Sequence, residues 1–210
     1  MEIYHTINKR IAGRAEYMKY NKTIKLKNGL EVILRNGTID DAEQVLDIFN
    51  KTHEETEFLL TYPEENPFTV EDEVKFLDEA EKSDKEVEIL ACIAKDERND
   101  GSDEKEYIVI GSAGFNPVGK MMKLKHRADF GISVLKDYWG LGIGTELIKG
   151  CIECAKEAGF DLMELQTVAE NNVAINLYKK MGFVEFGRNP YGFKKKDGSY
   201  QELVSMLCEL

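Results

Sequence analysis

Two kinds of hydrophobic pattern alternate along the chain and predict its secondary structure. Short apolar runs predict strands, whereas apolar residues spaced three and four apart predict helices. The predicted strands lie at residues 22–26, 30–34, 87–95, 106–118, 128–135, 161–168, 184–188 and 201–210. The predicted helices lie at residues 39–49, about 52–60, from 69 to at least 77, 144–158 and 172–181.

Turn and capping residues indicate where several of these elements begin and end. Asn28 and Gly29 separate two β-rich runs, and both residues accept a positive φ at low cost, so they predict a hairpin. Thr38 is followed three residues later by Asp41, which is typical of a helix N-terminus. Gly182 follows the last helical stripe and is expected to end that helix.

The order of these elements predicts the fold class. Strands and helices interleave as they do in α/β proteins, which favours a central mixed β-sheet of about six to seven strands flanked by helices on both faces. Residues 1–29 are interpreted as an N-terminal extension that includes the hairpin turn. Residues 30–210 are interpreted as one domain, because a chain of 210 residues fits a single compact core with an appendage.

Composition and charge narrow the class of partner. The chain is 42% hydrophobic and has 28 Lys and Arg against 39 Asp and Glu, a net charge of −11. A nucleic-acid partner is not expected, because such proteins usually present a basic face to the phosphates. No apolar stretch reaches the roughly 18 residues of a membrane span, and the first residues lack an apolar leader. We therefore expect a cytoplasmic protein with no membrane partner.

Four cysteines, at positions 92, 151, 154 and 208, are the only thiols. Cys151 and Cys154 form a C-x-x-C inside a predicted helix, away from the helix start where a low thiolate pKa is expected. No second cysteine pair or nearby histidine completes a zinc site. We interpret these cysteines as chemically inert and predict no metal.

The segment from Trp139 to Thr145 carries the first sign of chemistry. A strand ends there, three glycines alternate along the chain, and a helix begins. Glycines allow a tight turn and a close approach of ligand to backbone, and the first turn of a helix offers unpaired N–H groups to a phosphate. A tight turn without a ligand has the same pattern. A P-loop is excluded because no Gly-Lys-Ser/Thr follows, and Thr145 stands where a dinucleotide fingerprint needs a small residue.

A second segment, AENNVAINLYKKMGF, follows downstream. Taken alone, Asn171 could be a helix cap and Tyr178 a core residue. Together the two segments resemble the GNAT superfamily of N-acetyltransferases, with its acyl-CoA loop Arg/Gln-x-x-Gly-x-Gly/Ala and its later Asn-x-x-Ala-x-x-Leu-Tyr-x-x-x-Gly-Phe. Gly142 and Gly144 match the loop glycines, and the second segment matches throughout. Trp139 departs from the family pattern at the Arg/Gln position. The resemblance covers roughly residues 30–210.

The resemblance implies a binding site for acetyl-CoA as co-substrate. It also implies that the strand over 128–134 carries a bulge and splays from the next strand, leaving a wedge for the coenzyme. The coenzyme-binding residues implied in this way are Ile132, Ser133 and Val134 along the pantetheine arm, Gly140, Leu141, Gly142, Ile143, Gly144 and Thr145 around the pyrophosphate, and Asn171 and Ala174 on the second segment.

The family's chemistry implies roles for a few residues. An amine attacks the thioester directly, Tyr178 protonates the departing thiolate, and a backbone N–H near Val134 stabilises the developing oxyanion. The general base is not fixed by the motifs. Asp129 and His126 are the candidates, and for each a purely structural role stays open.

The expected acceptor is the primary amine of a small molecule, with free amino acids ahead of polyamines. The segments 126–134 and 187–206 resemble the branch of the family that acetylates amino acids. The cations expected to hold the acceptor's carboxylate are Arg35, Lys123, Lys125 and Arg127. A polyamine acceptor, a protein or peptide acceptor, and a non-catalytic acyl-CoA sensor remain alternatives, and a homodimer is left open.

Overall fold

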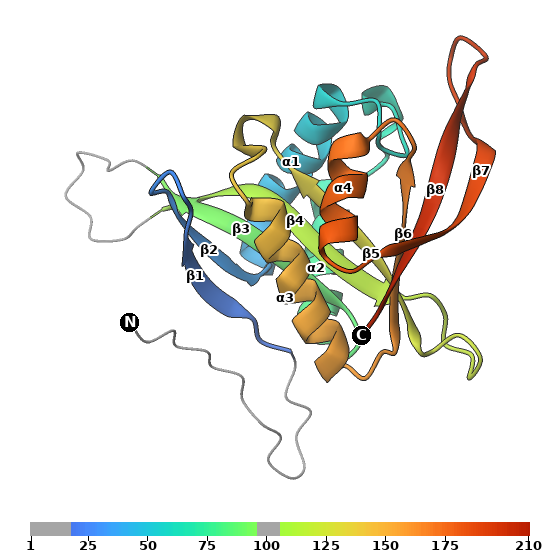
Figure 1. Ribbon diagram of the computed structural model, residues 1–210. Helices are drawn as coiled ribbons and strands as arrows, with labels where there is room; N and C mark the ends of the chain where they lie inside the picture. The colour runs from blue at the N-terminus through green and yellow to red at the C-terminus, as the bar shows by residue number, and fades with distance from the viewer. Residues whose placement is uncertain (1–17, 96–105) are drawn as a thin grey trace.

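One mixed β-sheet forms the centre of the molecule (Figure 1). The computed structural model describes residues 18–95 and 106–210. In these ranges eight strands pair in the order β1-β2-β3-β4-β5-β6-β8-β7. The elements are β1 Asn21–Lys25, β2 Glu31–Asn36, α1 Ala42–Glu55, α2 Val70–Glu81, β3 Val87–Ala94, β4 Tyr107–Pro117, β5 Arg127–Val134, α3 Ile143–Glu157, β6 Leu162–Val168, α4 Asn172–Lys180, β7 Val184–Lys194 and β8 Tyr200–Glu209.

The predicted α/β class is confirmed, but the sheet has one strand more than the upper limit expected. The extra strand is β1, which pairs antiparallel with β2 through a turn at Gly29, where φ is 89°. Tyr20 and Leu26 beside it are buried in the main core. The described part of the predicted extension is therefore built into the sheet, whereas residues 1–17 lie outside the described residues.

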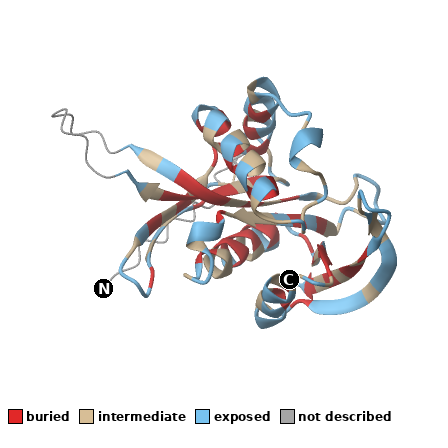
Figure 2. Ribbon diagram, turned by 90° about the horizontal axis from the view of Figure 1, so that it is seen from above, coloured by how far each residue is buried: buried red, intermediate tan, exposed pale blue. Residues whose placement is uncertain are grey.

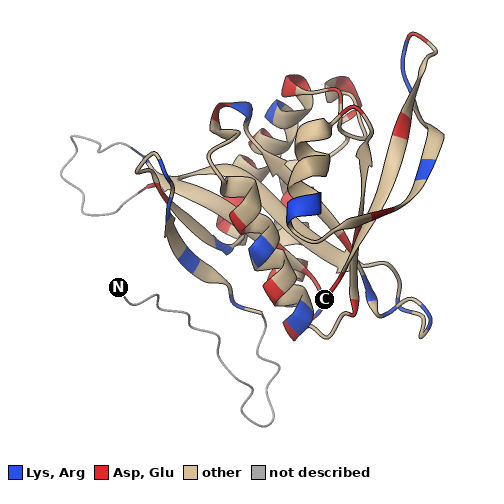
Figure 3. Ribbon diagram, viewed as in Figure 1, with Lys and Arg blue, Asp and Glu red and all other residues tan. Residues whose placement is uncertain are grey.

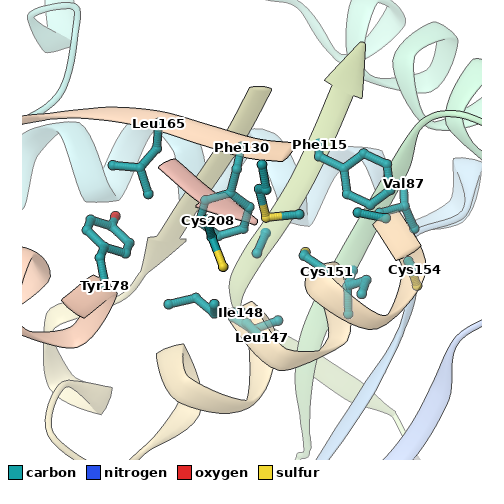
Figure 4. Packing of buried hydrophobic residues seen from close by; sticks show 14 of the residues in the cluster. Val87, Phe115, Phe130, Leu147, Ile148, Cys151, Cys154, Leu165, Tyr178 and Cys208 are labelled. Atoms are coloured by element: carbon teal, nitrogen blue, oxygen red, sulfur yellow. The ribbon is translucent and has the colours of Figure 1, made fainter. Parts of the chain in front are cut away.

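Helices cover both faces of the sheet (Figure 2). Helices α1 and α2 pack on one face, where Ile48, Leu77 and Leu90 belong to one buried cluster. Helices α3 and α4 pack on the other face, around Phe115, Phe130 and other residues of the larger cluster (Figure 4). None of the helices within the described ranges is long and apolar enough to cross a membrane.

The prediction of a separate helix at about 52–60 is wrong. Helix α1 continues without a break to Glu55, and the Thr52 hydroxyl donates to the Ile48 carbonyl at 2.8 Å one turn earlier. Thr56 then takes an extended conformation with φ −153° and ψ 150°, which ends the helix. The chain from there to the start of α2 is irregular apart from one 3₁₀ turn at Pro63–Glu65.

The predicted bulge in the strand over 128–134 is also not observed. Strand β5 pairs with β4 from Ala128 to Val134 without a register shift. The register shift lies one strand further away, between Ala91 and Cys92 where β3 pairs with β4. The expected splay is present, because β5 and β6 pair in parallel over only three residues and then separate.

Candidate functional site

The backbone of β5 has an edge beyond Asp129 that no strand among those described covers. On its other edge, the Leu135 N–H donates to the Ile110 carbonyl at 3.0 Å. Backbone groups of alternate residues in an antiparallel strand point the same way. The N–H and C=O groups of Ile132 and Val134 therefore point away from β4, into the gap left where β6 diverges.

Two backbone positions at that edge are not available to a ligand: Ser133 and the carbonyl of Val134. Ser133 belongs to the alternate set, so its backbone faces Ser112 of β4, and its side chain lines a cavity beneath α1 and α2. The Trp139 indole Nε1 donates to the Val134 carbonyl at 2.6 Å. The Val134 carbonyl is therefore already hydrogen-bonded to Trp139, whereas the Val134 N–H still faces the gap.

The glycine turn connects this edge to helix α3. Gly140 and Gly142 have φ of 75° and 98°, values that residues with a side chain rarely adopt. A Cβ on either would meet nothing within 4 Å, so the space above the turn is open. A Cβ on Gly144 would instead lie 3.1 Å from Leu177 Cδ2, so this glycine allows α3 and α4 to pack closely.

The side chains around the turn anchor it to the core. Ile143 is buried, and Leu141 packs against the main cluster. The N–H groups of the first turn of α3, which includes Ile143, Gly144 and Thr145, have no acceptor within the helix. This turn therefore offers backbone donors to an anion, as the glycine pattern predicts.

Asn171 caps helix α4, which is the alternative that the sequence leaves open for it beside a coenzyme contact. The Asn171 Oδ1 accepts from the Ala174 N–H at 3.2 Å. Ala174 is half-buried against the main cluster. One further turn along, Tyr178 is buried, with 7% of its surface exposed.

Tyr178 lies beside the point where β5 and β6 separate. Its ring is edge-on to Phe130, the first β5 residue after the paired part, with 6.5 Å between centroids. The centroid of the Phe183 ring is 5.8 Å from that of Tyr178. Burial raises the pKa of Tyr178 to about 12, so the phenol stays protonated at neutral pH and can donate its proton.

The two candidate bases occupy different places. Asp129 is the last β5 residue paired with β6, opposite Glu164, and burial together with Glu164 raises the pKa of its carboxyl. His126 precedes β5, and its carbonyl accepts from the Asp161 N–H at 2.9 Å. At about 3.3 Å per residue, His126 lies about 13 Å along the strand from Phe130. The structure does not bring it together with Tyr178.

The two arginines that were expected to bind the carboxylate of the acceptor are already paired with carboxylates of the protein. Arg35 makes two bonds to Asp41, at 2.7 and 2.6 Å, and Arg127 makes two to Glu164, at 2.9 and 2.7 Å. The loop 118–126, which carries Lys123 and Lys125, lies at the end of β5 away from the glycine turn; basic residues on it are visible in Figure 3.

A pocket of about 800 Å³ opens beside the end of β5. Residues 53–63 form one wall, the β7–β8 hairpin forms another, and Lys136 and Trp139 contribute between them. The two walls touch: Lys196 Nζ lies 4.0 Å from the centroid of the Tyr62 ring, and Gln201 Nε2 donates to the Glu57 carbonyl at 3.3 Å. Contact between segments so distant in sequence is not visible in local patterns.

Cys151 and Cys154 lie inside α3, where the sequence predicts a helix. Cys151 and Cys154 are buried in the main cluster, and burial raises the pKa of both thiols, to about 12 for Cys154. Within residues 18–95 and 106–210, no three metal-ligating side chains converge.

Comparison with known proteins adds a family and several relatives. The model described as the acetyltransferase (GNAT) family matches residues 43–183. The N-alpha-acetyltransferase of Sulfurisphaera tokodaii is 29% identical over 76% of this chain and 84% of that protein. The L-amino acid N-acyltransferase MnaT of Escherichia coli is 25% identical over 51% of this chain and 62% of that protein.

Other relatives match over a shorter span. The uncharacterised N-acetyltransferase MJ1207 of Methanocaldococcus jannaschii is 48% identical over 26% of this chain. That match spans 24% of the relative's length, and matches to two further uncharacterised N-acetyltransferases span 32% and 26% of theirs.

Solved structures share the fold. A GNAT-family acetyltransferase from Streptococcus pneumoniae superposes with a TM-score of 0.74 at 23% identity, over 85% of this chain and 99% of that one. YncA from Salmonella typhimurium, solved with its cofactor acetyl-CoA, gives a TM-score of 0.70 at 18% identity, over 85% of this chain and 94% of that one.

Proposed function

Because the chain belongs to the acetyltransferase (GNAT) family, we propose that it transfers an acetyl group from acetyl-CoA to the primary amine of a small molecule. The observation that carries this proposal is the meeting of three features at one place. They are the uncovered backbone edge at Ile132 and Val134, the glycine turn that leads into α3, and the buried phenol of Tyr178 beside the gap.

The residues around the gap fit the coenzyme. The N–H and C=O groups of Ile132 can bond to the amides of an extended pantetheine arm in the manner of an added strand, while the Val134 N–H stays available for the thioester oxygen. The open space over Gly140 and Gly142, next to the N-terminus of α3, suits the pyrophosphate. Acetyl-CoA would supply the acetyl group as a thioester.

The chemistry then needs an acid and an oxyanion donor. The neutral amine attacks the thioester carbonyl carbon, and the Val134 N–H stabilises the negative charge that develops on the carbonyl oxygen. The Tyr178 hydroxyl gives its proton to the departing thiolate. The phenol is protonated at neutral pH, so it has a proton to give when the thiolate forms.

The acceptor we propose is a free amino acid or a similar small zwitterion. The pocket of about 800 Å³ is lined by charges of both signs, the acidic Glu54, Glu55, Glu57 and Glu65 and the basic Lys136, Lys194 and Lys195. These lysines, rather than Arg35 and Arg127, would hold the carboxylate. The contact between Lys196 and Tyr62 narrows the space in which a long peptide could lie. The reduced, buried cysteines fit a cytoplasmic enzyme.

An acceptor screen tests the proposal. Amino acids, polyamines, aminoglycosides and short peptides are incubated with acetyl-CoA, and release of the free CoA thiol is followed. We expect turnover of an amino acid with the highest kcat/KM. Faster turnover of peptides or spermidine would contradict the acceptor assignment, and release from no amine would contradict the enzymatic function.

A variant of the glycine turn tests the coenzyme site. Gly142→Asp places a carboxylate and a side chain where the pyrophosphate is expected, so acetyl-CoA binding should be lost in calorimetry. Gly29→Asp is the matched control, because Gly29 has a similar φ of 89° and open surroundings but lies in the β1–β2 turn. Equal affinities for the two folded variants would show that the turn does not bind the coenzyme.

A further inference from the structure

A second cavity, of about 300 Å³, lies between the sheet and the helices α1 and α2. Its walls are mostly apolar and include Val45, Phe49 and Phe76. Its floor is polar and crosses three strands, with Glu88 on β3, Ser112 on β4 and Ser133 on β5. Ser133 lies between Ile132 and Val134, so this floor ends at the strand edge described above.

The pairing of the strands places the polar residues of the cavity floor side by side across β3, β4 and β5. Ser112 is paired with Ser133, and Glu88 is paired with Gly114, which is itself paired with Gly131. A Cβ on Gly114 would collide with Glu88 Oε2, so the carboxylate lies over β4. A Cβ on Gly131 would meet nothing within 4 Å. Only one strand spacing, about 5 Å, therefore separates the Glu88 carboxylate from the open surface of β5.

The surroundings of Glu88 set its proton affinity. Burial, opposed by a hydrogen bond from the Ser112 hydroxyl and aided by the charge of Glu73 on α2, raises the pKa of Glu88 to about 7. Asp72 of α2 also lines the cavity, and the Cys151 thiol of α3 interacts from the other face. The residues of α1 that line the cavity are apolar.

We propose that Glu88 is the final acceptor of the proton that the amine loses, with the hydroxyls of Ser133 and Ser112 passing it on. This inference rests on the proposed acetyltransferase function. Paired residues on one face of a sheet have Cβ atoms about 5 Å apart, a distance that rotating hydroxyls can bridge. Glu88 acts through the serines, so it is a positioning and proton-accepting residue that need not touch the substrate.

The proton balance is complete with these groups. The C–N bond forms as the amine attacks, one N–H proton passes through Ser133 and Ser112 to the Glu88 carboxylate, and the C–S bond breaks as Tyr178 protonates the thiolate. Glu88 then releases its proton to solvent, and the Tyr178 phenolate takes one up. The net reaction converts an amine and a thioester into an amide and a thiol.

Asp129 is the competing group, and the structure favours Glu88 over it. Asp129 lines neither of the two cavities described. Glu88 lies in a mostly apolar cavity with a hydroxyl bonded to it, an arrangement that brings a carboxylate's pKa near the operating pH of a base.

The pH dependence of kcat at saturating amine tests the assignment. The wild-type rate should rise with an inflection near pH 7 as Glu88 ionises. Glu88→Gln should lower kcat about 10²-fold at pH 7 and remove that inflection, with acetyl-CoA affinity unchanged in calorimetry. Asp129→Asn is the contrasting variant, and loss of the inflection in Asp129→Asn but not in Glu88→Gln would overturn the proposal.

Two further variants should move the inflection in opposite directions. Ser112→Ala removes both a hydroxyl of the relay and the hydrogen bond that lowers the pKa of Glu88, so kcat should fall and the inflection of the remaining rate should move to higher pH. Glu73→Gln removes a neighbouring negative charge, so it should move to lower pH. If the protein acetylates amines and its pH–rate profile is unchanged by Glu88→Gln, Ser112→Ala and Glu73→Gln, the role of Glu88 is contradicted but the acetyltransferase function is not. A chain that binds acetyl-CoA but acetylates no amine contradicts the function as well.

Discussion

The ring of Tyr178 packs against Phe130 and Phe183, and its hydroxyl is the proposed proton donor. Tyr178→Phe keeps that packing and removes only the proton donor. We expect kcat to fall about 10²-fold or more, the usual size of a general-acid effect, with the Kd for acetyl-CoA unchanged. Single-turnover rates are the measurement, because slow product release could mask a change in the chemical step.

Tyr107→Phe is a suitable control, since Tyr107 begins β4 away from the gap and also keeps its ring. A Tyr178→Phe variant with the wild-type single-turnover rate would leave Tyr178 with only a packing role.

Single residues were predictable where their roles depend on neighbours in the chain. The hairpin turn at Gly29 follows from local sequence, and the structure confirms it. Glu88 could not be singled out in this way, because its setting depends on its pairing with Gly114 across the sheet. Its one sequence signal is that it is the only charged residue within the apolar strand β3.

At the scale of elements, the β7–β8 hairpin contacts the segment 56–65 beside the larger pocket. Lys196 forms an ion pair with Glu64, and its backbone N–H donates to the Tyr62 hydroxyl at 3.1 Å. These groups are exposed, and exposed pairs contribute no more than about 1 kcal/mol to stability.

Lys196→Ala should therefore leave the protein folded but loosen this contact. We expect kcat/KM for a short peptide, relative to a free amino acid, to rise about 3- to 10-fold, which corresponds to roughly 1 kcal/mol. Competition between the two acceptors measures the ratio directly. Lys82→Ala removes an exposed ion-paired lysine that follows the end of α2, and it serves as the control. An unchanged ratio would mean that the hairpin does not restrict the acceptor.

Elements were predicted well where a cap or turn marks their limits and poorly where none does. Thr69 begins α2 as expected, with its hydroxyl accepting from the Asp72 N–H. The segment at 52–60 has helical apolar spacing but no cap of its own, and its first residues continue α1. The bulge expected in β5 came from the resemblance, and the unshifted pairing with β4 contradicts it.

For the whole molecule, an ion pair between Arg35 and Asp41 joins the sheet to the helical layer above it. Burial alone would raise the pKa of Asp41, but hydrogen bonds from Arg35 and Thr38 hold it below its usual value. The folded pKa is thus lower than the unfolded one. The stabilisation is fully present above about pH 4 and is lost as the pH falls through the folded pKa.

Asp41→Asn should lower the free energy of unfolding at pH 7 by about 3 kcal/mol, because it leaves Arg35 without its partner. The variant should also lose less stability than the wild type between pH 4 and pH 2. Urea denaturation at pH 7 and pH 3 measures both effects. Asp78→Asn, in an exposed pair with Lys82, should change stability little. A similar loss in both variants would contradict the role of the Arg35 pair.

The architecture as a whole was predictable as a class but not as a topology. The alternation of strands and helices indicates a mixed sheet, but it does not reveal that β8 lies between β6 and β7. Pairings of that kind join distant residues, and periodicity carries no information on them. The predicted boundary between the N-terminal extension and the domain, at residues 29 and 30, falls inside the β1–β2 hairpin. The pairing of β1 with β2 extends the sheet to the N-terminal side of that boundary.

Trp139 has a practical consequence as well as a structural one. It is the single tryptophan of the chain, 44% exposed, and its indole N–H is bonded to Val134 at the edge where the coenzyme is expected. Emission from an indole moves to shorter wavelength when water is removed from it. The protein therefore carries its own optical reporter, and a titration of fluorescence with acetyl-CoA should follow occupancy of the gap without any label or any turnover.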